Sequence, residues 1–146
     1  MLWHNAAMPL VPEASLAEAV AEASAQMHDP NYISTRVDRF IAAQPAIAKH
    51  VMAQAARLTV EGIVSVLFHA QVLSDGVTRA CGPRARAVPL ATLQQAAGTT
   101  LEALAEDEPH LASYIASNVT DQPGARFSSA TARSLLAQVA RALVLG

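Results

Sequence analysis

Apolar residues recur at helical spacing along almost the whole chain. Ile33, Val37, Phe40 and Ile41, for example, are separated by four, three and one positions, which places them on one face of a helix. No segment shows the strict alternation of apolar and polar residues that is typical of a half-buried strand. The pattern therefore predicts an all-α fold: a compact bundle of about six to seven helices in a single domain over residues 1–146.

Two capping boxes interrupt the apolar pattern. Ser15 is followed three residues later by Glu18, and Thr92 is followed at the same distance by Gln95. In such a box the hydroxyl accepts a hydrogen bond from the third backbone N–H, and the acid or amide reaches back to the cap. We expect a helix to begin at each box, the second of them spanning about 89–106.

Prolines mark the starts of three predicted helices. Proline suits the first helical position because its missing N–H would have no intrahelical partner there. The residue before a proline avoids helical angles, so one helix is expected to end at Gln44 and another to begin at Pro45. On this basis helices are predicted at about 30–44, 45–58 and 109–118.

Residues 60–73 are predicted to form a central helix. Thr59 can cap its start, and the turn-forming residues at 74–76 are expected to end it. A helix that is apolar nearly all round is usually buried among other elements. The apolar residues that surround most of this helix are Ile63, Val64, Val66, Leu67, Phe68 and Val72.

The chain contains an internal echo. When Pro45 is aligned with Pro109, an acid or amide precedes both prolines and apolar residues follow both at the same spacing. The two capping boxes also correspond, and each half ends in a capped apolar helix. We interpret residues 12–75 and 89–145 as duplicated halves related by a pseudo-two-fold axis. The alternative is that any two amphipathic helices joined at a proline look alike.

The segment between these halves, residues 77–88, has no sustained apolar period and contains Gly82 and Pro83. It is predicted to be an exposed linker. Its arginines form a candidate anion-binding site, consisting of Arg79, Arg84 and Arg86. No aromatic residues are interleaved with them, so solvated loop charge is the simpler interpretation and a nucleic-acid partner is not expected.

The composition bears on three properties of the protein: its surface charge, its relation to membranes and its disulfide content. Hydrophobic residues make up 52% of the chain and charged residues only 15%, so its surface is poor in charge. The longest apolar run is too short for a membrane span. The single cysteine, Cys81, excludes an intramolecular disulfide and fits a cytoplasmic location. Neighbouring arginines would favour its thiolate, but a bystander loop cysteine is the simpler interpretation.

The histidines are expected to have a structural role in packing rather than a catalytic or metal-binding one. None has the spacing of a zinc motif, and no glycine-rich phosphate loop, nucleophile elbow or pair of catalytic carboxylates is present. We therefore expect no catalytic residue, metal or cofactor. The candidate ligand-binding residues are His50, His69 and Tyr114, which would line a cavity between the two halves. A core histidine with a hydrogen-bond partner is the competing interpretation of His69.

Taken together, these patterns favour a non-enzymatic helical protein-interaction domain that self-associates, with a homodimer as the expected form. A surface poor in charge and rich in apolar residues is easily covered by a second subunit. Two alternatives stay open. One is a binder of a small apolar or amphipathic ligand between the halves. The other is a nucleic-acid-associated regulator that uses the arginines of residues 77–88.

Overall fold

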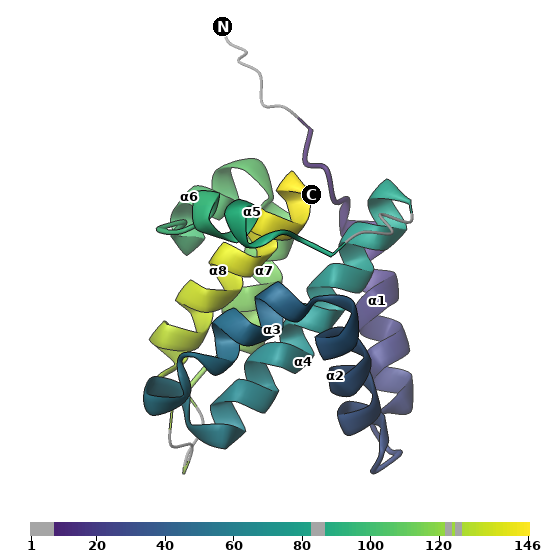
Figure 1. Ribbon diagram of the computed structural model, residues 1–146. Coiled ribbons are helices and arrows are strands. Elements are labelled where there is room, and N and C mark those ends of the chain that lie inside the picture. Colours follow the sequence, from purple (N-terminus) through teal and green to yellow (C-terminus); the bar gives the residue numbers. More distant parts are fainter. Residues whose placement is uncertain (1–7, 83–86, 122–123, 125–126) are drawn as a thin grey trace, which may run out of the picture.

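The computed structural model describes residues 8–82, 87–121, 124 and 127–146, and all regular structure in these residues is helical (Figure 1). The all-α prediction and the compact helical bundle are confirmed. The helices are α1 (Glu13–Gln26), α2 (Tyr32–Ala43), α3 (Pro45–Met52), α4 (Ala55–Cys81), α5 (Leu90–Gln95), α6 (Leu101–Asp107), α7 (Pro109–Asn118) and α8 (Ser129–Leu145).

Helix α4 lies at the centre, as its apolar circumference predicts. It packs against α1, α2, α3 and α8, and Val66, Leu67 and Leu73 are among its fully buried side chains. Within the described residues it is the one helix long and apolar enough to cross a membrane by length and composition alone. A helix at the centre of a bundle can have the same apolar character, and four neighbouring helices pack against this one.

The two predicted capping boxes do not form. Helix α1 begins after Pro12 and helix α5 after Pro89, and neither helix has a side-chain cap. Both prolines are extended, with φ −68° and ψ 157° at Pro12 and φ −69° and ψ 155° at Pro89. The helices thus start three residues earlier than the boxes predict, so Ser15 and Thr92 lie inside the first turns.

Thr59 is a predicted cap, and for the last helix the sequence offers Ser128 or Ser129; of these, Ser128 acts as a cap. The Ser128 hydroxyl accepts a hydrogen bond from the backbone N–H of Thr131 in α8. Thr59 instead interrupts α4 with φ 64° and ψ 172°, a conformation that side-chain-bearing residues rarely adopt. Its Oγ1 is buried without a hydrogen-bond partner among the described residues, so the cap prediction at Thr59 is wrong.

The predicted turn at 74–76 is also wrong, because α4 continues through it to Cys81. Gly76 is helical and lies where α1 crosses α4. A Cβ at this position would lie 2.9 Å from Cδ1 of Leu16. The glycine therefore serves close packing. The first part of the predicted linker 77–88 is helical as well, and residues 83–86 lie outside the described residues.

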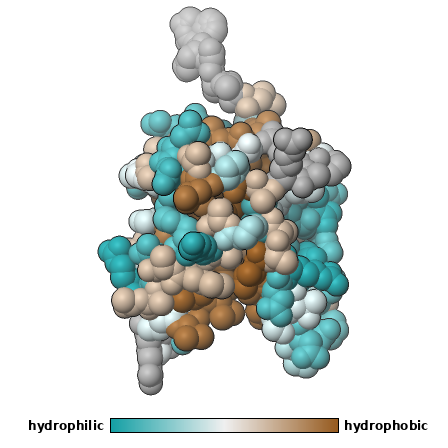
Figure 2. Space-filling model, in the orientation of Figure 1, coloured by the Kyte–Doolittle hydropathy of each residue, from teal (hydrophilic) through white to brown (hydrophobic). Residues whose placement is uncertain are grey.

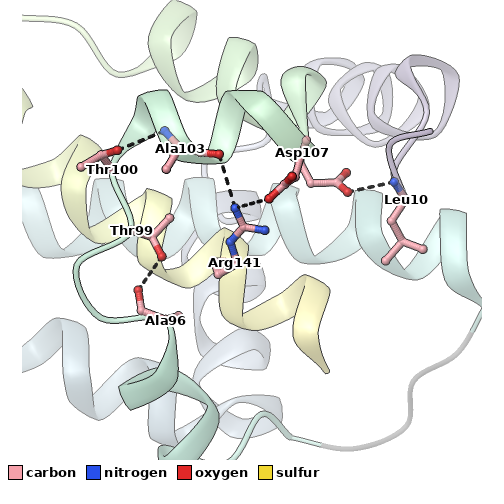
Figure 3. Close-up of polar contacts among 8 residues, drawn as sticks. Leu10, Ala96, Thr99, Thr100, Ala103, Asp107 and Arg141 are labelled. Carbon is pink, nitrogen blue, oxygen red and sulfur yellow. Dashed lines mark hydrogen bonds and ion pairs between the residues drawn. The ribbon is translucent and has the colours of Figure 1, made fainter. Parts of the chain in front are cut away.

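The helix predicted over 89–106 is two helices, α5 and α6. Gly98 has φ +82° in the connection between them, where a glycine adopts the left-handed region without strain. The Thr100 hydroxyl then caps α6 by accepting a hydrogen bond from the Ala103 N–H at 3.0 Å (Figure 3).

The helix–proline–helix corner occurs twice, as predicted. Gln44, between α2 and α3, has φ −130° and ψ 67°, and Glu108, between α6 and α7, has φ −132° and ψ 69°. Pro45 and Pro109 begin the helices that follow. The helix expected over 45–58 is shorter than predicted, because α3 ends at Met52.

Candidate functional site

His69 of α4 and Tyr114 of α7 form a partly buried pair. The His69 Nδ1 lies 2.7 Å from the Tyr114 hydroxyl, and the His69 ring packs edge-on against Phe68 at 5.6 Å between centroids. Burial lowers the pKa of the His69 imidazole and raises the pKa of the Tyr114 phenol. Burial thus favours the neutral form of both groups, and the tautomer of the imidazole decides which of the two donates the hydrogen bond. This is the core histidine with a hydrogen-bond partner that the sequence also allowed.

His50 does not join this pair. Its Nε2 lies 3.0 Å from Oε1 of Gln138 in α8, and the Gln138 side-chain amide donates to the Leu93 carbonyl at 2.9 Å. His50 lines one groove and Tyr114 lines another. The structure thus joins two of the three candidate ligand-binding residues and places the third in a different groove.

The two grooves differ in size and in the charge of their linings. The larger, of about 700 Å³, lies between α3, the α5–α6 connection and α8, and Arg57, Glu102 and Arg133 are its charged residues. The smaller, of about 480 Å³, lies between α1 and α7, with Glu13 as its acidic residue. Both are open to solvent and lined by a mixture of polar and apolar side chains.

A pair of reciprocal contacts joins the two halves of the chain. The Gln44 side-chain oxygen accepts a hydrogen bond from the Val88 N–H at 2.7 Å. The Glu108 carboxylate accepts from the N–H groups of Leu10, at 2.8 Å, and Val11, at 3.1 Å (Figure 3 shows the bond at Leu10). Each corner residue therefore holds the segment that precedes the first helix of the opposite half.

A second reciprocal pair involves the candidate ligand-binding residues. His50 contacts Gln138, and Tyr114 contacts His69. His50 and Tyr114 hold equivalent positions after the corner prolines, and aligning α4 with α8 at Thr59 and Ser128 makes His69 equivalent to Gln138. The helices follow the same rule, since α1 packs on α7 and α5 packs on α3.

Gln44 and Glu108 are the residues that sequence reasoning missed. The internal echo does include an acid or amide before each corner proline, but nothing in the sequence indicates what these side chains bind. Glu108 is 4% exposed, and its two backbone donors account for a buried carboxylate there. A contact between residues 98 positions apart leaves no local pattern from which it could have been predicted.

The candidate anion-binding arginines have a different role where the structure describes them. Arg79 forms ion pairs with Asp75, through Nε at 3.1 Å, and with Glu22 of α1. The hydrogen bond to Asp75 is the main reason that the pKa of Arg79 is raised. Arg84 and Arg86 lie outside the described residues. Cys81 is half-buried at the end of α4 and packs against the core.

No cluster of three or more histidine, cysteine, aspartate or glutamate side chains able to hold a metal occurs in the part of the chain that the structure describes. Comparison of the chain with protein-family models, with curated proteins and with solved structures gives no match.

Proposed function

We propose that the protein is a non-enzymatic helical interaction domain that self-associates as a dimer. The observation that carries the proposal is an apolar surface at the junction of α3 and α4. Val60 is 79% exposed, Met52 42% and Val64 39%. Val60 and Val64 are one turn apart on α4, so they project from the same side of that helix.

The chain as a whole is poor in charge, since charged residues make up only 15% of it. Figure 2 shows hydrophobic residues over the lower part of α4 and again near the upper end of the molecule, with weakly apolar residues between them. Large apolar side chains left in water cost free energy that a partner subunit removes by covering them. Depletion of charge with exposed apolar residues is typical of the centre of a protein interface.

The reciprocal contacts support a second part of the proposal, that residues 12–75 and 89–145 arose by duplication. In a two-fold dimer, residue i of one subunit contacts residue j of the other, and j contacts i. The pairs Gln44–Val88 and Glu108–Val11 follow this pattern. Chance similarity of amphipathic helices gives no reason for side chains to exchange partners in this way.

Sedimentation equilibrium over a range of concentrations tests self-association. The parent should sediment as a dimer at high concentration, and Val60→Asp should raise the dissociation constant by roughly tenfold or more, because a buried charge replaces an apolar contact. Leu90→Asp is the matched control, since Leu90 is 55% exposed at the other end of the molecule. A parent that stays monomeric at every concentration, or equal effects of the two substitutions, would contradict the proposed interface.

A further inference from the structure

A third pocket, of about 210 Å³, lies between α2 and α4 on the first half of the chain. Six of its eight lining residues are polar or charged, whereas the contact that normally joins two packed helices is apolar. The polar residues that line it are Arg36, Arg39, Gln71, Ser74, Asp75 and Thr78. Sequence reasoning assigned none of these residues to a site.

Two polar atoms in this lining are buried and unpaired. Nε of Arg36, a donor that an anion would satisfy, has no hydrogen-bond partner among the described residues. Oε1 of Gln71 also has none, but it is an acceptor, so only the NH₂ group of the Gln71 amide can face an anion. A buried polar atom without a partner is destabilising, and such atoms in a folded protein need an explanation. The Arg36 guanidinium lies 5.8 Å from the centre of the Tyr32 ring, and this cation–π contact holds it in place.

The charge around the pocket favours an anion. Arg36 and Arg39 contribute two positive charges, and guanidinium groups match the geometry of carboxylate and phosphate oxygens. Asp75 is the acidic residue of the lining, and its carboxylate is paired with Arg79 at 3.1 Å. The hydroxyls of Ser74 and Thr78 add donors on the α4 side.

The fold itself does not require this polar lining. In the second half, Thr100 stands at the position equivalent to Arg36, where its hydroxyl caps α6. Leu143 stands at the position equivalent to Ser74 and is buried. A buried leucine in α8 thus stands at the position that Ser74 holds in the lining of the pocket.

We propose that the pocket between α2 and α4 binds a small oxyanion, a carboxylate or a phosphate group. The guanidinium groups of Arg36 and Arg39 contact its oxygens, and the Gln71 amide and the hydroxyls of α4 complete the site. The volume of the pocket restricts the ligand to a small molecule or to one anionic group of a larger one.

Calorimetric titration of the full-length protein with inorganic phosphate and, separately, with acetate tests this, with sodium chloride at equal ionic strength as the reference. We expect saturable heat with at least one of the two anions and none with chloride. Saturation by one anion alone identifies the ligand as phosphate or carboxylate, and saturation by both supports the shared oxyanion chemistry. No saturable heat with either anion would overturn the proposal.

Substitutions locate the binding. Arg36→Gln should weaken the anion by roughly tenfold, the usual effect of losing one charge-assisted hydrogen bond. Arg39 is exposed, so Arg39→Gln should fold like the parent and also weaken binding, which keeps the test decisive if the Arg36 variant does not fold. Arg57→Gln, in the larger groove, is the matched control. An equal loss in the Arg57 variant, or none in the Arg39 variant, would contradict the site.

Discussion

Gln44 and Glu108 each precede a corner proline and have nearly the same backbone angles, but they accept different numbers of hydrogen bonds. The amide of Gln44 accepts one backbone hydrogen bond, and the carboxylate of Glu108 accepts two. The two halves are similar in the contacts by which each corner residue binds the segment before the first helix of the other half. They differ where each half packs on its own: α1 has 14 residues and α5 has six, and α1 alone reaches far enough for Glu22 to pair with Arg79.

The two halves also differ at the start of their last long helices, α4 and α8. They differ again in the pocket between α2 and α4, which is described for the first half. Ser128 caps α8, while its counterpart Thr59 is held in a conformation that favours glycine and caps nothing. The pocket with Arg36 lies in the same half as Thr59. Strained backbone and unpaired polar groups are often found at functional sites. The comparison therefore directs attention to the first half, where both features occur.

The largest expected effect comes from removing the Glu108 contact. Glu108→Ala leaves the Leu10 and Val11 N–H groups without their acceptor and should lower the free energy of unfolding by about 3–5 kcal/mol. Glu108→Gln, which copies Gln44, keeps one acceptor and should cost clearly less. Urea denaturation of both variants measures the difference. Equal losses in the two variants would mean that the hydrogen bond kept by glutamine contributes nothing to stability.

Phe68 is the next most sensitive position. It is partly buried against the core, packs edge-on against Tyr32 at 6.5 Å between centroids, and has Ala137 as its counterpart in α8. Phe68→Ala removes this aromatic side chain and should lower the free energy of unfolding by about 2–4 kcal/mol. Thermal melts at several concentrations should show the same decrease throughout, because the defect lies in the core and not in a subunit interface.

Thr59→Gly should stabilise the protein. Glycine adopts φ 64° and ψ 172° without strain and removes the unpaired Oγ1, so we expect a gain of about 1–2 kcal/mol despite the added freedom of the unfolded chain. Ser128→Gly is the matched change in the second half. It removes a working cap from favourable backbone and should destabilise by a few tenths of a kcal/mol. If both substitutions have the same sign, the two positions do not differ as their backbones indicate.

The smallest expected effect is on the pH dependence of the free energy of unfolding. Burial lowers the folded-state pKa of His69, so the unfolded chain binds a proton more readily than the folded one. The stability contributed by neutral His69 is complete above the unfolded pKa of about 6.5 and is lost as pH falls toward the lower, folded value. His69→Gln, which copies Gln138, should remove this part of the dependence. His28→Gln, an exposed position, should not.

Sequence patterns predicted the features that depend on neighbours along the chain. The apolar circumference of α4 and the two proline corners follow from spacing and from the geometry of proline. Features that depend on distant segments could not be predicted. Gly76 has the signature of a turn because nothing nearby shows that Leu16 packs against it. The capping boxes are correct motifs, but an extended proline upstream begins each helix before they can act.

The residues of the candidate sites were likewise predicted only in part. Sequence reasoning selected His50, His69 and Tyr114, and all three make polar contacts between the halves. It placed them in one cavity because it had no means of separating two grooves. Arg36 was missed because an arginine on the exposed side of an amphipathic helix is usually solvated. Its burial depends on how α2 packs on α4, and the sequence of α2 alone does not specify that contact.

The bond from the Leu10 N–H to Glu108 joins residues 98 positions apart, and this has a consequence for synthesis on the ribosome. Glu108 is translated 98 residues after Leu10, so the Leu10 N–H has no access to this acceptor until that length of chain has been added. Until then the segment before α1 has no anchor, and the first half stays incomplete. Contacts of such long sequence separation slow folding because a large loop must close before they form. The native structure is therefore completed late, after the second half has left the exit tunnel.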